Sequence, residues 1–358
     1  MSVIGDIYNI PQPFAMYVGN CETRAQAKVA AGTIEWAPEK VCCTVDDGNN
    51  LFPNVPSINP ADVHKTDAET LVIGCAPFGG RIDEHMDKAI RSAIYRGRNI
   101  AAAMHTRLAD NPEYVELADR YNVKLYDFRH RPDAYPLGTG EKRSGLRLLT
   151  VGTDSSCGKK FTTLSLYREL KRIHADTVFC STGQTGFLIS GCGINNDTIV
   201  ADFLAGAAES LSPAGPADRI YLIEGQGAIT HPAYTGGSMS LIAGSQPDHL
   251  ILCHAWNRQN QLGVKRKPDL DFEMRANIEA ARIHGLHPTY IGISINFSEC
   301  DLTQDEQDKI LYQLASTYEI PVFDPSQDTS VLRDLARMLA TKAKARSLDG
   351  QASPAQAV

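Results

Sequence analysis

Short apolar runs alternate with helical patterns along most of this chain, and that alternation restricts the fold more than any other feature. In the first half, the apolar runs occupy residues 15–18, 41–47, 70–75, 99–105 and 124–128. Between residues 83 and 97, apolar side chains recur three and four positions apart, as they do on one face of a helix. Strands that are apolar on consecutive positions and separated by helices are typical of a parallel sheet covered on both faces. The pattern therefore predicts an α/β fold.

A polar segment rich in Pro and Gly, residues 129–145, interrupts the alternation and indicates a boundary between two domains. The alternation then resumes, with apolar runs at residues 146–152, 177–182, 219–225, 249–255, 289–297 and 320–324. We predict a Rossmann-like domain over residues 1–143, a P-loop NTPase-like domain with a parallel sheet over residues 144–345, and a disordered tail over residues 346–358. The expected strands of the first half are not followed by G-x-G-x-x-G, so we expect no dinucleotide-binding role there.

Composition argues against several classes of function. The net charge of −7 argues against general binding to nucleic acid or to a membrane surface. No run approaches the ~18 apolar residues of a membrane span, and the N-terminus lacks the pattern of a signal peptide. The nine cysteines have irregular spacing and no zinc-site pattern, which favours free thiols in a reducing compartment. We expect a cytoplasmic homo-oligomer without a bound metal, acting on a small molecule.

The stretch VGTDSSCGKKFTT, residues 151–163, has the features of a phosphate-binding loop. An apolar strand pattern precedes it and a helical pattern follows it. Gly152 and Gly158 free the backbone to wrap an anion, which successive N–H groups and the helix start can then bind. We predict ligand contacts from Gly152, Asp154, Ser155, Ser156, Cys157, Gly158, Lys159, Lys160 and Thr162. The alternative is a tight strand-to-helix turn with two solvated lysines.

This loop departs from the usual P-loop pattern in two ways. Five residues separate Gly152 from Gly158, where the usual pattern has four. Lys160 also stands where such loops carry the Ser or Thr that binds Mg²⁺. Thr162 or Thr163 replaces that hydroxyl only if the loop is shifted. Two lysines without a Mg²⁺ ligand suit a phosphate group that is held but not transferred.

Further candidates lie at or after the other expected strand ends. Glu224, in LIEGQG, occupies the place where P-loop enzymes carry an acidic residue, although it could simply orient Lys159. Residues 181–193 are rich in Gly and Thr and predict a second ligand loop that includes Gly183 and Gln184. His231 follows Glu224 closely, but a lone His is more often structural. The polar segment 254–269 is either a solvated basic loop or a contact for an anion.

The motifs resemble those of known proteins. GTDSSCGKKFTT together with IEGQG resembles the dethiobiotin synthetase class, which carries GTD-x3-GKT. The whole plan, with its start PFAMYVGN and its segment DFRHRP, is similar to a family long of unknown function that pairs a Rossmann-like half with a P-loop half. One branch of that family comprises D-glutamate N-acetyltransferases, which use acetyl-CoA. The resemblance implies that the loop holds the phosphates of coenzyme A, while Lys160 argues against ATP-dependent carboxylate chemistry.

Acetyl transfer to an amino acid requires a base, an oxyanion site and cations for carboxylates. Glu224 or His231 is the expected base, and the turns at 183–186 or 225–227 could supply oxyanion N–H groups. Arg129 and Arg131 are expected to bind the two substrate carboxylates, unless they form salt bridges within the linker.

Three other readings stay open. Cys157 could form an acyl-enzyme, because a helix start and a lysine lower the pKa of a thiol. The protein could instead be an ATP- and Mg²⁺-dependent ligase or kinase resembling dethiobiotin synthetase, although the residue at position 160 speaks against it. It could also be a non-catalytic module that binds a nucleotide or coenzyme A.

Overall fold

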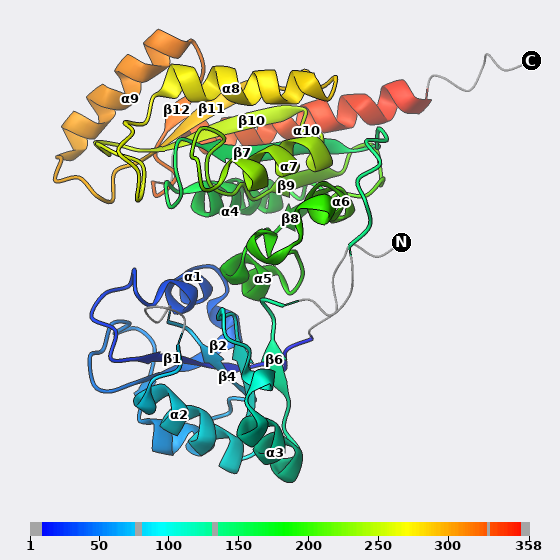
Figure 1. Cartoon of the computed structure of the whole chain (residues 1–358). Coiled ribbons are helices and arrows are strands. Elements are labelled where there is room, and N and C mark those ends of the chain that lie inside the picture. Colours follow the sequence, from blue (N-terminus) through cyan, green and yellow to red (C-terminus); the bar gives the residue numbers. More distant parts are fainter. Residues whose placement is uncertain (1–8, 76–80, 131–134, 328–329, 352–358) are drawn as a thin grey trace, which may run out of the picture. The chain divides into compact units, whose positions relative to one another are not determined.

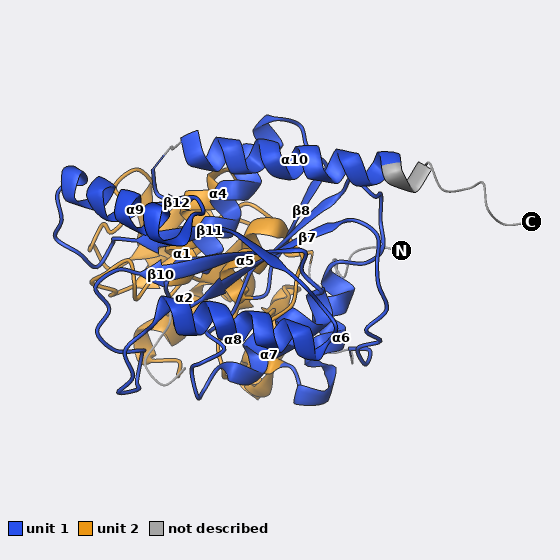
Figure 2. Ribbon diagram, turned by 90° about the horizontal axis from the view of Figure 1, so that it is seen from above, with its two compact units in different colours: residues 1, 135–182, 199–358 blue, residues 2–134, 183–198 orange. Residues whose placement is uncertain are grey.

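A computed structural model describes residues 9–75, 81–130, 135–327 and 330–351 (Figure 1). Within these residues, the chain forms two compact units, each built on a six-stranded parallel sheet. One unit contains residues 2–134 together with residues 183–198, and the other contains residues 135–182 and 199–358 (Figure 2). The predicted α/β class is confirmed.

The sheet of the N-terminal unit has the strand order β3-β2-β1-β4-β5-β6, which is the order of a Rossmann sheet. Its strands are β1 (Phe14–Gly19), β2 (Val41–Asp46), β3 (Ser57–Ile58), β4 (Thr70–Ile73), β5 (Asn99–Ala102) and β6 (Leu125–Asp127). Its helices are α1 (Lys28–Trp36), α2 (Glu84–Tyr95), α3 (Pro112–Tyr121) and α5 (Gln184–Ser190). α1 and α5 pack together on one face, and α2 and α3 cover the other (Figure 1).

The sheet of the C-terminal unit has the order β12-β11-β10-β7-β9-β8. Its strands are β7 (Leu146–Gly152), β8 (Thr177–Cys180), β9 (Ile220–Ile223), β10 (His249–Ala255), β11 (Thr289–Asn296) and β12 (Val322–Phe323). The chain builds β8 and β9 on one side of β7 and then crosses to β10 on the other. The carboxyl end of β7 is therefore the switch point, where α/β sheets bind ligands.

Helices cover both faces of this second sheet. They are α4 (Lys159–Arg172), α6 (Ala201–Leu211), α7 (Thr235–Ser245), α8 (Leu270–Ile283), α9 (Gln304–Tyr318) and α10 (Ser330–Gln351). α4 and α10 pack together on one face, whereas α6, α7 and α8 lie on the other (Figure 2). Short 3₁₀ segments complete the described elements: η1 (Pro38–Lys40), η2 (Pro60–Lys65), η4 (Leu108–Asp110) and η5 (Asn196–Thr198).

Two expectations from the sequence need correction. Residues 181–193 do not form an open ligand loop, because residues 184–190 form α5, whose Phe187 stacks on Phe128 at 5.7 Å between ring centroids. The expected tail from residue 346 is also helical as far as Gln351, because α10 continues through it. Arg346 holds that end of the helix through Nη2, which donates to Asp248 Oδ1 at 2.7 Å. Residues 352–358 lie outside the described part.

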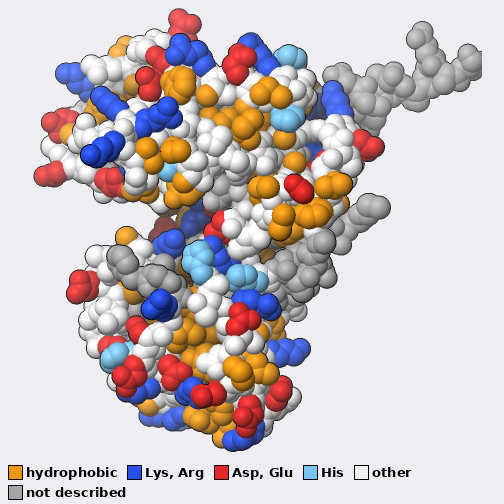
Figure 3. Space-filling model, in the orientation of Figure 1, with side chains coloured by type: hydrophobic (Ala, Val, Ile, Leu, Met, Phe, Trp, Pro, Cys, Tyr) orange, Lys and Arg blue, Asp and Glu red, His pale blue; other side chains and the backbone are white. Residues whose placement is uncertain are grey.

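Two features of the structure concern the charge of the surface and the hydropathy of the helices. On the face drawn in Figure 3, acidic and basic side chains are intermixed. In the part of the chain that the structure describes, no helix is long and apolar enough to span a membrane.

Candidate functional site

The loop from Thr153 to Gly158 joins β7 to α4 at the switch point of the second sheet. Ser156 and Gly158 both have positive φ, at 53° and 104°, and Gly158 is the N-cap of α4. Left-handed residues within such a turn bring successive N–H groups together as an anion nest. The N–H groups of Ser156, Cys157 and Gly158 have no acceptor among the described residues. The backbone thus provides unused donors at a helix start, where an anion is favoured.

Lys159 is buried behind this loop. Its Nζ donates to the main-chain carbonyls of Asp154 at 2.6 Å and Gly227 at 2.7 Å. The ammonium therefore links the phosphate loop to the loop that follows β9. The ammonium has a third N–H, which lies 3.5 Å from Cys157 Sγ and is the donor that a phosphate oxygen could take over without loss of either carbonyl. Lys160, next in the chain, is half-buried.

The hydroxyls near the start of α4 point into the protein. Thr162 Oγ1 donates to Gly158 O at 3.0 Å and lies 2.7 Å from Ser294 Oγ. Thr163 Oγ1 donates to Lys159 O at 2.8 Å. Because both side chains are fully buried, neither replaces the hydroxyl that Lys160 removes from the usual pattern. Thr162, predicted as a ligand contact, lies between α4 and the sheet.

Asp154 and Arg258 hold the outer part of the loop. The Asp154 carboxylate is fully buried and accepts hydrogen bonds from Ser155 N, Leu262 N and Arg258 Nη1, at 2.7, 2.8 and 3.0 Å. Arg258 also donates to Ser155 O at 2.7 Å and to Glu299 at 2.6 Å. Segment 254–269 was predicted to be either a solvated basic loop or a contact for an anion, and neither prediction describes Arg258. Its side chain is only 7% exposed and shapes the phosphate loop. Sequence reasoning did not identify this pair.

Glu224 lies directly after β9, at the same sheet edge as the phosphate loop. Its carboxylate is buried and accepts a hydrogen bond from Thr182 N at 3.1 Å. Burial raises the pKa of Glu224, while the nearby Lys160 and the hydrogen bond from Thr182 act in the opposite direction. A buried carboxylate with a raised pKa beside a ligand loop has the properties of a general base.

Close packing against β7 explains why a glycine, Gly225, follows Glu224. A Cβ at position 225 would lie 1.7 Å from Thr150 O, so no other residue fits against β7 there. The N–H of Gly225 donates to Thr150 Oγ1 at 3.0 Å.

His231 is also near the loop, but both of its ring nitrogens are engaged. Nδ1 accepts from Ala233 N at 3.2 Å, which assigns the ring proton to Nε2, and Nε2 then donates to Leu262 O at 3.0 Å. The ring is buried and stacks on Tyr234 with 4.4 Å between centroids. This geometry favours a structural role for His231 and makes Glu224 the better candidate base.

A buried polar network fixes the neighbouring loops. Glu273, on α8, accepts from Ile229 N at 2.9 Å and from the hydroxyl of Thr230. Gln261 donates to Thr230 Oγ1 at 3.0 Å and to Thr153 O at 2.9 Å, so the network reaches the phosphate loop. Its members lie far apart in the sequence, and no motif identifies them.

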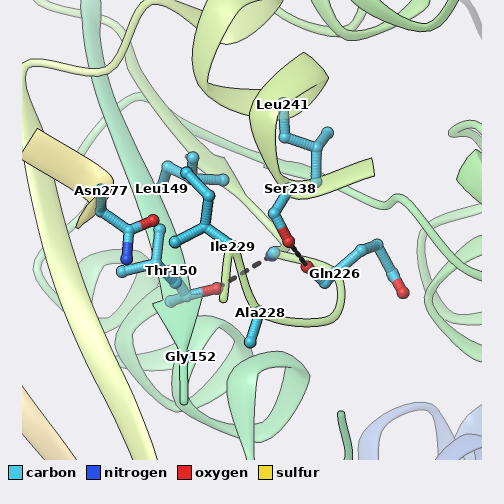
Figure 4. Close-up of a pocket in the computed structure, with 11 residues that line it drawn as sticks. Leu149, Thr150, Gly152, Gln226, Ala228, Ile229, Ser238, Leu241 and Asn277 are labelled. Atoms are coloured by element: carbon cyan, nitrogen blue, oxygen red, sulfur yellow. Dashed lines mark hydrogen bonds between the residues drawn. The ribbon is translucent and has the colours of Figure 1, made fainter. Parts of the chain in front are cut away.

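A small cavity lies behind the site, between β7, α7, α8 and the loop after β9 (Figure 4). Its volume is about 10 Å³, enough for one water molecule but not for a substrate. Asn277 lines it, and the Oδ1 atom of Asn277 has no partner among the described residues. The cavity is therefore too small to be the substrate site.

The remaining predicted residues belong to the N-terminal unit. Gly183 is the N-cap of α5, and Gln184 donates to Asp197 Oδ2 at 3.3 Å. Arg129 is buried and binds the same Asp197 oxygen through Nη2 at 2.7 Å, while its Nε has no partner among the described residues. Arg131 lies outside the described residues. The role of Arg129 as a carboxylate ligand stays a prediction.

Cys157 faces the interior of the phosphate loop. Its thiol is buried and donates to Asp154 O at 3.2 Å, with Lys159 Nζ 3.5 Å away. Among the described residues, no group of three or more His, Cys, Asp or Glu side chains is placed to hold a metal ion.

The fold and the phosphate loop together define a two-domain protein with a Rossmann-like half and a P-loop half. A family model described as "Domain of unknown function (DUF1611_C) P-loop domain" matches residues 136–333, and the "(DUF1611_N) Rossmann-like domain" model matches residues 36–131. The chain belongs to the DUF1611 family, as its resemblance to a two-domain family predicted. A crystal structure of a DUF1611 family protein from Anabaena variabilis is 25% identical, with a TM-score of 0.80, and covers 92% of this chain and 100% of that one.

Two curated relatives carry a functional name. A protein from a Pseudoalteromonas species named D-glutamate N-acetyltransferase is 38% identical over 329 residues, which cover 89% of this chain and 96% of the relative. A protein from Tritonibacter scottomollicae with the same name is 34% identical over 324 residues, covering 88% and 95%.

Proposed function

We propose that this protein transfers the acetyl group of acetyl-CoA to the amine of D-glutamate. The observation that carries the proposal is the similarity, over nearly nine-tenths of the chain, to two relatives named D-glutamate N-acetyltransferase. Such a reaction needs a site that holds phosphates without transferring them, and a base that accepts a proton from an ammonium group.

The phosphate loop fits the phosphates of coenzyme A. Unused N–H groups at residues 156–158, together with Lys159 and Lys160, supply donors for an anion. The hydroxyls of Thr162 and Thr163 are engaged in the interior, so the start of α4 offers no side-chain oxygen to a nucleotide-bound Mg²⁺. These features favour a donor whose phosphates are bound and not cleaved.

Glu224 is the proposed base. The substrate ammonium gives one proton to Glu224, and the neutral nitrogen then attacks the thioester carbon. A C–N bond forms as the C–S bond breaks, and coenzyme A leaves as the thiol with the second nitrogen proton. The raised pKa of Glu224 suits this role, because it brings the carboxylate closer in basicity to the group that it deprotonates. Because the N–H of Gly225 already donates to Thr150 Oγ1, the N–H groups of Gln226 and Gly227 in the same turn are the proposed donors to the thioester oxygen.

A direct assay tests the reaction. Protein incubated with acetyl-CoA, D-glutamate and EDTA, without ATP, is expected to release free thiol and N-acetyl-glutamate in equal amounts. L-glutamate serves as the control substrate, and we expect little turnover with it. A requirement for ATP, or loss of turnover in EDTA, would contradict the proposed reaction.

A further inference from the structure

The pairing of β1 with β2 in the Rossmann sheet contains a β-bulge. Phe14 pairs with Val41, but the next residue of β1, Ala15, pairs with Cys43. Cys42 is therefore an extra residue of β2 that has no partner on β1. Successive side chains of a regular strand point to opposite faces of the sheet, and a bulge interrupts that alternation. The bulge thus decides where the side chains of Cys42 and Cys43 point.

The two cysteines face the same apolar core, although they follow each other in the chain. Cys43 is buried in the core cluster that includes Ala15 and Val45, and the half-buried Cys42 packs against the same cluster. The two Sγ atoms lie 3.6 Å apart, and Cys42 Sγ also lies 3.3 Å from Phe14 O. Both cysteines are free thiols. The bulge therefore creates a pair of adjacent thiols on one face of the sheet.

Cys42 is the more accessible and the more readily ionised of the two thiols. Within the described residues, β3 pairs with β2 only at Thr44 and Val45, so the segment with the two cysteines is paired on one side only. The S–H of Cys43 stabilises the thiolate of Cys42 and lowers the pKa of Cys42 to about 7, whereas the hydrogen bond to Cys42 and burial raise the pKa of Cys43. A ligand therefore bonds to Cys42 first.

The number and the spacing of the sulfurs indicate which ligand would suit them. An ion bonded tetrahedrally to two sulfurs at about 2.3 Å holds them about 3.8 Å apart, close to the observed 3.6 Å. Thiolates select soft ions. A structural Zn²⁺ takes four protein ligands, but no group of three or more His, Cys, Asp or Glu among the described residues is placed to hold a metal. Trivalent arsenic needs only two thiolates, because it can keep a hydroxyl group as its third substituent.

We propose that Cys42 and Cys43 form a chelating dithiol site for trivalent arsenic. In the reaction with arsenous acid, two As–O bonds and both S–H bonds break while two As–S bonds form. Each departing hydroxide takes up one thiol proton and leaves as water. No atom changes its oxidation state, so the step needs neither an oxidant nor a reductant. This inference does not depend on the proposed acetyl transfer.

Arsenite is the probe for this site. Native mass spectrometry of the reduced full-length protein with arsenite is expected to show one arsenic atom per chain. Excess glutathione, a monothiol, should leave the complex intact because it cannot chelate, whereas 2,3-dimercaptopropanol should remove the arsenic. After digestion with trypsin, the arsenic should be found on residues 41–65, which contain Cys42 and Cys43 and no other cysteine. It should be absent from residues 173–219, which also contain two cysteines.

Variants separate the chelating pair from the other thiols. Cys42→Ala and Cys43→Ala should each abolish the complex that survives glutathione, with thermal melting as the check that each variant is folded. Cys180→Ala is the matched control, because Cys180 is also a buried free thiol but lies in the other unit, where it donates to Leu211 O at 3.2 Å. This control should bind arsenic as wild type does. Wild-type protein that holds no arsenic in glutathione would overturn the proposal, as would a folded Cys42→Ala variant that still binds one atom.

Discussion

Replacing Glu224 with glutamine is expected to lower kcat by roughly 10²–10⁴, with little change in the KM for acetyl-CoA. Glutamine keeps the size of the side chain and its hydrogen bond from Thr182, but it cannot accept a proton. Steady-state rates of thiol release at saturating D-glutamate measure the effect. Because a base works only when deprotonated, wild-type kcat should rise with pH through the raised pKa of Glu224, and this acidic limb should be lost in Glu224→Gln.

Glu273→Gln is the matched control for that variant. Glu273 is another buried acid whose pKa burial raises, but its oxygens accept from Ile229 and Thr230 and it lies within α8. We expect Glu273→Gln to lower thermal stability while keeping kcat within roughly tenfold of wild type, since it removes no base. A near-normal kcat in Glu224→Gln would return Glu224 to a structural role, and His231 would then be the next residue to replace.

Lys159→Ala and Lys160→Ala are each expected to weaken acetyl-CoA binding by roughly ten- to a hundredfold. A charged hydrogen bond to phosphate contributes about 1.5–3 kcal/mol, which converts to about that change in affinity. Because the phosphates do not react, the loss should appear in the KM for acetyl-CoA and much less in kcat. Lys159→Ala also removes the link between Asp154 O and Gly227 O, so its effect on stability should be the larger.

Salt and an exposed lysine elsewhere in the chain provide the controls for these two variants. High salt should weaken acetyl-CoA binding to wild type more than to either variant, because screening acts on charges that the variants lack. Lys265→Ala, an exposed lysine of the neighbouring loop, should leave the KM unchanged. A fall in kcat at constant KM would mean that the two lysines act on the chemical step instead.

The local features of the fold could be predicted because each depends on a pattern within one short segment of the sequence. β7 is buried along its whole length, and its apolar run identified it directly. The helix over residues 84–95 has its apolar face buried, as the spacing predicted. β3 was missed because Ser57 and Ile58 form a two-residue edge strand that is too short to show a period.

Features that depend on distant partners could not be read from the sequence. Residues 183–198 join the N-terminal unit because Lys40 donates to Ile189 O at 2.8 Å and α5 packs on α1. The sequence placed Arg258 either in a solvated basic loop or in contact with an anion, because its buried partner, Asp154, lies 104 residues earlier. For His231, the sequence allowed both a structural role and a role as base, and the contact of Nε2 with Leu262 O, 31 residues later, favours the structural one.

Titration calorimetry of acetyl-CoA against Mg-ATP tests most directly whether the phosphate loop holds coenzyme A. We expect wild-type protein to bind acetyl-CoA, with or without Mg²⁺, more tightly than Mg-ATP. Lys160→Thr, which rebuilds the usual GKT sequence, should weaken acetyl-CoA binding because it loses a cation. Tight binding of Mg-ATP by wild type, strengthened by Lys160→Thr while acetyl-CoA binding stays unchanged, would contradict the assignment.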